Sequence, residues 1–374
     1  MIRFLLCLAL AAGTAAQAQH GHHPHERLDG VLSVDLVADG ATLHLLTGEQ
    51  RSGLSHAHSA DGGLTWSVPV RLPGTPRLTM RGDDARIAAR GDALLAVWGT
   101  AGTGFGGSGP LAAAVSGDGG RTWSAGGNPA DDGLTTGHGY IALSASADAM
   151  HAVWLDSRDQ RQGLRYARSV DGGRNWQRNV TVAAGTCECC WNALLDSANG
   201  MQVLYRGKTP RDMRLATRTG GKWIQRGAVG AFGWKINACP ETGGALAGSR
   251  DALHALVWTQ REDQEGLHYL RSRDGGATWS RPRRIGTAAA QHSDLARSAA
   301  GLLAAVWDED GAIYLASSAD EGARWSAPRR ISAAAVDASH PRIAPTSQGF
   351  FVVWTQAGRA RERILGKESV KMAR

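Results

Sequence analysis

Three of the five cysteines in this 374-residue chain lie within four positions, in the segment Thr186-Cys187-Glu188-Cys189-Cys190-Trp191. A fourth, Cys239, follows about fifty residues later. Thiols at this density carry out disulfide chemistry or bind soft metal ions, because thiolates pair in oxidising compartments and select Cu(I) and Zn(II). The chemistry of this segment therefore depends on the elements that position it.

Residues 1–18 have the pattern of a secretory signal peptide. A positive start at Arg3 precedes the apolar run Phe4–Ala12, and Ala16 and Ala18 give the small-residue pattern of a cleavage site. Cys7 lies inside the apolar run and leaves with the peptide. No later run approaches the ~20 apolar residues that span a bilayer. We expect an exported protein, periplasmic or secreted, with no membrane span.

The formal net charge is +7, but the basic residues are scattered along the chain. Scattered positive charge is typical of a solvated surface and not of a face that binds nucleic acid. We therefore expect no nucleic-acid partner.

One turn pattern recurs in five good copies, with Ser first, Asp two residues later, a glycine pair or single glycine, and Trp at the end; a sixth, degenerate copy begins with Thr217 and has Thr219 in place of the Asp. The Asp side chain can accept hydrogen bonds from the turn's own amides, and glycine adopts positive φ without a Cβ clash. The pattern predicts hairpin turns, with each Trp opening the next strand. The six copies are Ser59–Trp66, Ser116–Trp123, Ser169–Trp176, Thr217–Trp223, Ser272–Trp279 and Ser318–Trp325.

These turns resemble the Asp-box, or BNR, repeat of sialidase-like β-propellers. The resemblance covers nearly the whole chain after the signal peptide. It implies an all-β fold of four-stranded blades, with the turn between the third and fourth strand of each blade.

A second pattern, an apolar strand that usually ends in Val-Trp, recurs seven times and indicates the second strand of each blade. Seven copies favour a seven-bladed propeller over residues 29–366; six blades with an added hairpin is the alternative. Residues 19–28 would be a His-rich N-terminal segment and residues 367–374 a basic tail. The seven copies are Leu43–Leu46, Leu95–Trp98, Ala152–Trp154, Val203–Tyr205, Leu256–Trp258, Ala305–Trp307 and Val352–Trp354.

In a propeller the first strand of each blade lines the axis, and its start faces one mouth of the channel. Aligning these starts on the apolar residues that follow gives one position per blade, rich in Cys and His. The cysteines and histidines of this ring, Cys190, Cys239, His138, His292 and His340, suit copper, which we favour, or zinc. Cys187 and Cys189 would be further ligands or a redox pair. The aligned positions are Asp29, Asp84, His138, Cys190, Cys239, His292 and His340.

The expected N-terminus after cleavage offers a secondary metal site at His20, His22, His23 and His25. A disordered tail is the alternative for this segment.

Disulfides are the alternative for the cysteines, because an oxidising compartment favours them. Cys190–Cys239 would join neighbouring blades, and Cys187–Cys189 would close a small loop. The chain would then be a metal-free scaffold that binds another periplasmic or outer-membrane protein.

The sialidase resemblance also implies a glycosidase with three arginines around a substrate carboxylate, a Tyr–Glu nucleophile pair and an Asp acid. Matching positions are Arg86, Arg342, Tyr140, Glu241 and Asp84. A third arginine has no matching position, so we expect metal handling in preference to glycan hydrolysis, and a sialidase-like hydrolase as the alternative.

A second resemblance is to uncharacterised bacterial BNR-repeat proteins with a Cys-Glu-Cys-Cys motif. It covers the expected fourth and fifth blades, and it implies that the cysteines, Arg206 and Arg211-Asp212 form one constellation. The matching segments are Cys187–Cys190, Tyr205-Arg206, Arg211-Asp212 and Trp234–Pro240.

Overall fold

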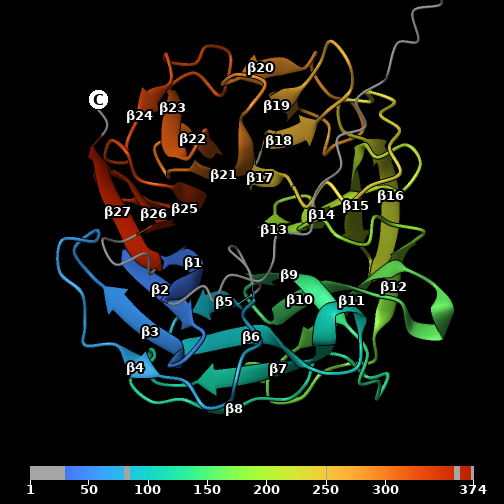
Figure 1. Ribbon diagram of the computed structural model, residues 1–374, viewed down its shortest axis with the longest axis vertical. Helices are drawn as coiled ribbons and strands as arrows, with labels where there is room; N and C mark the ends of the chain where they lie inside the picture. The colour runs from blue at the N-terminus through green and yellow to red at the C-terminus, as the bar shows by residue number, and fades with distance from the viewer. Residues whose placement is uncertain (1–29, 80–84, 250, 358–362, 372–374) are drawn as a thin grey trace, which may run out of the picture.

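The structure, a computed structural model, describes residues 30–79, 85–249, 251–357 and 363–371. Seven antiparallel sheets stand around one axis, and in each the strands follow one another outward in chain order (Figure 1). This is the expected seven-bladed β-propeller. Within these ranges the helical segments are two 3-10 turns, η1 (Phe105–Gly107) and η2 (Arg158–Gln160), and no helix is long and apolar enough to cross a membrane.

The first four blades each contain four strands. Blade 1 has β1 (Val31–Asp39), β2 (Thr42–Glu49), β3 (Gly53–Ser59) and β4 (Val70–Arg71). Blade 2 has β5 (Ala85–Arg90), β6 (Ala93–Ala101), β7 (Ser108–Ser116) and β8 (Ser124–Ala125). Blade 3 has β9 (His138–Ala145), β10 (Met150–Asp156), β11 (Gly163–Ser169) and β12 (Val180–Ala184). Blade 4 has β13 (Ala193–Ser197), β14 (Gly200–Arg206), β15 (Met213–Thr219) and β16 (Lys222–Ala228).

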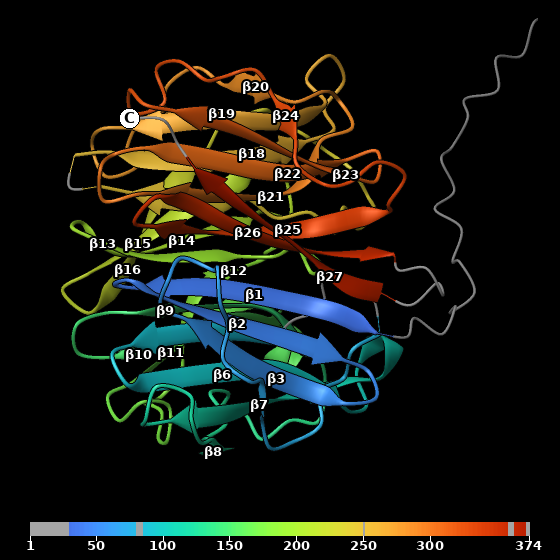
Figure 2. The same cartoon turned by 90° about the vertical axis from the view of Figure 1, so that its left-hand side faces the viewer.

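The last three blades complete the ring, which Figure 2 shows from the side. Blade 5 has β17 (Ala245–Gly248), β18 (Leu253–Thr259), β19 (Gly266–Ser272) and β20 (Arg283–Ile285). Blade 6 has β21 (Gln291–Arg297), β22 (Leu303–Glu309), β23 (Ala312–Ser318) and β24 (Arg329–Arg330). Blade 7 has β25 (Ala338–Thr346), β26 (Gly349–Ala357) and β27 (Arg363–Lys371). Strand β27 extends past residue 366, the expected end of the propeller, into the segment expected to be a basic tail.

Several sequence predictions concern residues outside the described ranges. These are the signal peptide, the histidines at 20, 22, 23 and 25, and the first-strand positions Asp29 and Asp84.

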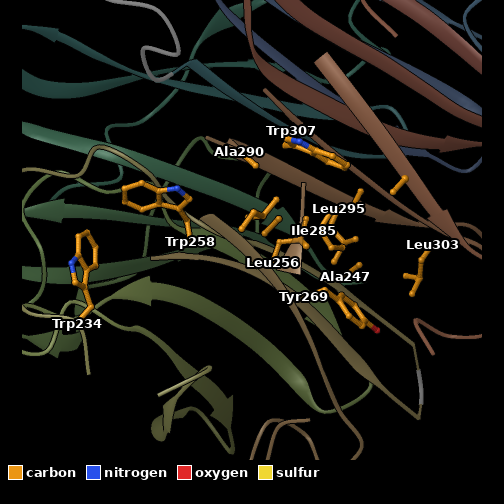
Figure 3. Close-up of a cluster of buried hydrophobic side chains, with 14 residues drawn as sticks. Trp234, Ala247, Leu256, Trp258, Tyr269, Ile285, Ala290, Leu295, Leu303 and Trp307 are labelled. Atoms are coloured by element: carbon orange, nitrogen blue, oxygen red, sulfur yellow. The ribbon is translucent and has the colours of Figure 1, made fainter. Parts of the chain in front are cut away.

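The hydrophobic core is divided among the seven junctions between blades. At the junction of blades 5 and 6, Trp258 and Tyr269 meet Leu295 and Trp307 (Figure 3). Phe351 and Val353 of blade 7 pack with residues of β1 and β2, and so close the ring between the two ends of the chain. Each buried Leu, Val or Phe contributes about 1.5–3 kcal/mol, so each blade depends on its two neighbours for stability.

Five of the recurrent turns contact the preceding blade. In the first turn the Ser59 hydroxyl donates to Asp61 at 2.7 Å, and the amide of Thr65 donates to the Asp61 carboxylate at 2.9 Å. Gly63 has φ of 93°, and a Cβ there would lie 2.3 Å from the Phe351 ring of blade 7. The Trp66 ring packs on the same Phe351, with centroids 5.3 Å apart.

Four further turns have the same Asp-to-amide hydrogen bonds, at Asp118, Asp171, Asp274 and Asp320. The degenerate copy in blade 4 is instead a two-residue hairpin, in which Thr219 pairs with Lys222. All six lie between the third and fourth strands of their blades, as the resemblance implied.

Buried histidines in the blades are held in the neutral state. Burial is the main cause that lowers the pKa of His44, His56, His151 and His254 to about 4. His151 is held by the hydroxyls of Ser146 and Tyr166, at 2.9 and 2.8 Å. Gln202 occupies the equivalent position of blade 4, where the Ser197 hydroxyl donates to it at 2.9 Å.

These histidines predict acid lability in a defined range. An unfolded histidine titrates near 6.5 and these folded ones near 4, so the unfolded chain binds more protons between those values. The thermal unfolding temperature should therefore be level above pH 6.5 and fall between pH 6.5 and 4. His151→Gln, which copies Gln202, should make that fall shallower in differential scanning calorimetry. The same slope in variant and wild type would contradict this assignment.

Candidate functional site

A backbone bulge recurs at the start of three innermost strands. The register shifts between Val153 and Leu155 opposite β9, between Gln291 and Asp294 in β21, and between Ser339 and Arg342 in β25. At these bulges Tyr140, His292 and His340 have φ of 56°, 36° and 55°. Positive φ is uncommon for residues other than glycine, and bulges re-aim side chains beside functional sites. Tyr140, His292 and His340 thus share one structural position in their blades.

Strand pairing corrects the sequence alignment of the ring. The bulges and the loops of unequal length shift the apolar residues on which the starts were aligned, so the expected positions are displaced by one residue in blade 4, two in blade 3 and three in blade 5. In blades 3 to 7 the residue just before the Trp or Tyr of the second strand lies opposite a residue of the first strand. The equivalent positions lie two residues before that partner, and they are Tyr140, Trp191, Thr242, His292 and His340. His138, Cys190 and Cys239 are therefore not equivalent to the two histidines.

The three clustered cysteines form a compact buried group ahead of β13. The sulfur of Cys187 lies 3.0 Å from that of Cys190 and 3.7 Å from that of Cys189. All three side chains are at most 5% exposed, and their sulfur atoms lie within 4.8 Å of one another. The amide of Cys187 donates to the carbonyl of Arg206 at 2.9 Å, which fixes the segment to the end of β14.

Two buried arginines accompany the thiols. The Nη1 of Arg211 donates to the sulfur of Cys187 at 2.9 Å and lies 3.6 Å from the Glu188 carboxylate. Arg206 is 1% exposed, and its guanidinium donates to the carbonyl oxygens of Arg211, Thr242 and Trp258. Among the described residues no carboxylate pairs with Arg206. A buried cation without a carboxylate favours negative charge on the neighbouring thiols.

The pKa of one thiol in the cluster is lowered, and the pKa values of the other two are raised. Hydrogen bonds from the Cys189 and Cys190 thiols lower the pKa of Cys187, and the Arg211 guanidinium adds to this effect. The pKa of Cys189 is raised because its thiol donates to Cys187, and burial raises the pKa of Cys190 to about 12. These directions favour a thiolate at Cys187 that accepts hydrogen bonds from two thiols and a guanidinium.

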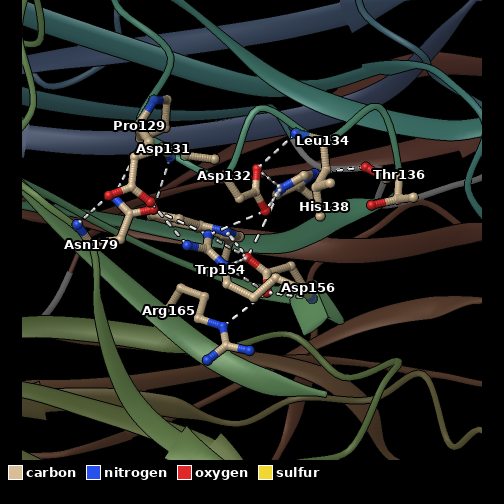
Figure 4. A network of polar contacts seen from close by, with 12 residues as sticks. Pro129, Asp131, Asp132, Leu134, Thr136, His138, Trp154, Asp156, Arg165 and Asn179 are labelled. Atoms are coloured by element: carbon tan, nitrogen blue, oxygen red, sulfur yellow. Dashed lines mark hydrogen bonds and ion pairs between the residues drawn. The ribbon is translucent and has the colours of Figure 1, made fainter. Parts of the chain in front are cut away.

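The remaining predicted ligands do not join this cluster. Cys239 is exposed, and all four cysteines are free, so neither disulfide of the alternative hypothesis, Cys190–Cys239 or Cys187–Cys189, is present in the structure. His138 is buried in blade 3, where its Nδ1 faces the Thr136 carbonyl at 2.7 Å and its Nε2 faces Asp132 at 3.0 Å (Figure 4). His138 thus belongs to a separate group with Asp132 and Asp156, whose ligand atoms lie within 4.8 Å of one another, and not to the thiol cluster.

His292 and His340 form a separate group with an acid that the sequence analysis missed. Their imidazole rings stack with centroids 3.9 Å apart, and His292 Nδ1 lies 2.9 Å from an oxygen of Asp308. Trp191 meets both rings edge-on, with centroids 6.1 and 5.6 Å away. Asp308 directly follows the Trp of its second strand, and the equivalent position in the other blades is a neutral residue or Arg206. A single acid at this repeated position was the sequence signal that could have identified it.

The axis contains a cavity of about 390 Å³, lined by all seven innermost strands and by Trp191, His292 and His340. Arg86 and Arg342 also line it; Arg86 donates to the carbonyl of Ile141, and Arg342 pairs with Asp35 at 3.2 Å. Tyr140 and Glu241, the other described members of the hydrolase hypothesis, are not among the lining residues. Tyr140 packs against the cysteines, and Glu241 is exposed.

The constellation implied by the Cys-Glu-Cys-Cys resemblance is assembled except for Cys239. Arg206 and Arg211 lie beside the cysteines, and both oxygens of Asp212 accept backbone hydrogen bonds, from Gly233 at 2.8 Å and Trp234 at 3.1 Å. The side chains of Arg211 and Asp212 thereby join the cysteine segment to the loop before β17.

No protein-family model and no curated protein matches this sequence. The polysaccharide lyase Uly1 is similar in structure, with a TM-score of 0.62 and 8% identity over 95% of this chain and 93% of that one. The SapL1 lectin, solved with α-methyl fucoside, has a TM-score of 0.51 and 13% identity, over 81% and 97%. A Trypanosoma rangeli sialidase has a TM-score of 0.50 and 12% identity over 92% of this chain and 54% of its own. The chain thus spans about half of that sialidase, and the likeness shows a sialidase-like β-propeller fold.

The contact between Arg211 and Cys187 predicts how the thiolate titrates. Metal-free protein should absorb in the ultraviolet as one thiolate per molecule at neutral pH. A hydrogen bond to a charged group contributes about 1.5–3 kcal/mol, so Arg211→Gln should raise the midpoint of this titration by at least about one pH unit. Lys208→Gln is the matched control, since Lys208 pairs with Glu188 and not with a thiol. Equal midpoints in the two variants would contradict the assignment.

Proposed function

We propose that this chain is an exported metal-handling protein that binds one thiophilic metal ion, foremost Cu(I), through Cys187, Cys189 and Cys190. The observation that supports this most directly is the convergence of three buried sulfur atoms within 4.8 Å of one another. Deprotonated thiols are the ligands that Cu(I) prefers, and burial protects such an ion from exchange with solvent.

Charge balance supports a monovalent ion at this site. Three thiolates and one Cu(I) carry a net charge of −2, and the buried guanidinium groups of Arg206 and Arg211 supply +2. Binding would release two protons, because one thiolate is already present in the metal-free cluster.

The number of ligands favours copper over zinc. Zinc in closed sites takes four ligands in tetrahedral geometry, whereas the thiol group has three members among the described residues. Trigonal sulfur coordination is suited to Cu(I). The role would be copper binding and homeostasis, with the rest of the propeller surface open to a periplasmic or outer-membrane partner.

Cysteine substitutions test the proposal. Protein loaded anaerobically with Cu(I) and dialysed against a competing Cu(I) chelator should retain one copper at this site. Cys187→Ser and Cys190→Ser should each lose it. Cys239→Ser is the matched control, since this exposed cysteine lies outside the cluster and its loss should leave retention unchanged.

Free-thiol counting on the same samples identifies the competing role. Copper retained equally by Cys187→Ser and wild type would overturn the proposal. Copper-free protein with no free thiols, recovered after copper exposure, would instead support the disulfide-containing scaffold.

A second candidate function is binding or hydrolysis of an acidic glycan in the axial cavity. Arg86 and Arg342 line that cavity, and sialidases, a lectin and a polysaccharide lyase share the fold. Turnover of a fluorogenic sialoside that disappears in Arg342→Ala would support it. Because Tyr140 does not line the cavity, Tyr140→Phe should leave any such turnover unchanged, which distinguishes this site from a sialidase mechanism with Tyr140 as nucleophile.

A further inference from the structure

A second set of metal-ligand side chains lies at the cavity, apart from the thiols. One ligand atom from each of His292, Asp308 and His340 falls within 4.8 Å of the others. The carboxylate of Asp308 holds both histidines: it lies 2.9 Å from His292 Nδ1, and it accepts the backbone amide of His340 at 2.9 Å. Two neighbouring blades thus each bring a histidine to one buried acid, His292 through its ring and His340 through its backbone amide.

The backbone places these histidines at a conformational cost. Both have positive φ, at equivalent bulges of β21 and β25. A non-glycine residue in this region costs on the order of 1–3 kcal/mol, and such strain concentrates at functional sites. At these bulges the two imidazole rings stack with their centroids 3.9 Å apart.

We propose that His292, His340 and Asp308 bind a divalent transition metal ion of the Zn(II) class, independently of the thiol cluster. Ligands about 2.0–2.2 Å from one tetrahedral ion lie roughly 3.2–3.6 Å apart, so small side-chain adjustments from the present spacing suffice. Two imidazoles and one carboxylate suit divalent ions of intermediate softness such as Zn(II). They bind soft Cu(I) poorly, because Cu(I) prefers sulfur ligands.

The position gives this site a different character from the closed thiol cluster. His292 and His340 line the 390 Å³ cavity, and the His292 side chain is 21% exposed. A three-ligand ion there keeps at least one coordination position open to a molecule in the cavity, as catalytic and ligand-binding metal sites do. Trp191, which follows Cys190 directly, covers the edges of both rings and lies between the two ligand sets in the chain.

Zinc binding by the full exported chain tests this inference. The parent for all variants carries alanine at the histidines of positions 20, 22, 23 and 25, because that segment is itself a candidate chelator. In equilibrium dialysis with Zn²⁺, His292→Ala and His340→Ala should each bind one equivalent less than the parent. Asp308→Asn keeps the shape of the side chain and should weaken the same equivalent. His58→Ala, at a half-buried histidine of blade 1, is the matched control and should bind as much as the parent.

Cobalt(II) separates this inference from the proposed copper site. In the parent, His292→Ala should remove d–d absorption from a nitrogen and oxygen site, and leave any thiolate-to-cobalt charge-transfer band unchanged. Cys187→Ser should have the opposite effect. Near-ultraviolet circular dichroism confirms that each variant is folded. Equal zinc in the parent, His292→Ala and Asp308→Asn, or an equal loss in His58→Ala, would overturn the inference.

Discussion

Closure of the seven-bladed ring is the constraint on which every candidate site in this protein depends. Phe351 and Val353 of blade 7 are buried against blade 1, and this contact closes the ring. Closure places all seven innermost strands around one axis. The starts of these strands meet there, however far apart they lie in sequence. Residues from blades far apart in the sequence therefore come into contact: Tyr140 meets Trp191, Trp191 meets His340, and His340 stacks on His292. Closure of the ring brings these residues near one another, and the bulges set the direction of their side chains.

The charges around the thiol cluster differ in sign from those around the histidine pair. Buried cations surround the thiols: Arg211 contacts Cys187, and Arg206 has no carboxylate partner in the described part of the chain. The histidine pair instead faces an anion, Asp308, beside the cavity. A cationic shell around sulfur suits a monovalent soft ion, whereas an anion beside imidazoles suits a divalent borderline ion. The two proposed metal sites share no ligand residue.

Much of the fold could be predicted from sequence because each repeat contains, within a few residues, the groups that make its own hydrogen bonds and packing contacts. The hydrogen bonds of Asp61 with its own turn, and the packing of Trp66 on the preceding blade, are encoded within eight residues. The site was predicted less well. Cys187, Cys189 and Cys190 are close because they are close in sequence, but the pairing of His292 with Asp308 depends on the bulge in β21. A bulge leaves no mark in the apolar pattern, and a shift of one to three residues was enough to place His138 and Cys239 wrongly on the ring.

The central claim is that three buried thiolates, and not imidazoles, hold copper in this propeller. X-ray absorption at the copper edge of Cu(I)-loaded protein tests that claim most directly, because it reads the ligand atoms themselves. The account predicts a first shell made only of sulfur, with three scatterers. A first shell of nitrogen or oxygen, or a sulfur shell that persists in Cys187→Ser, would contradict it.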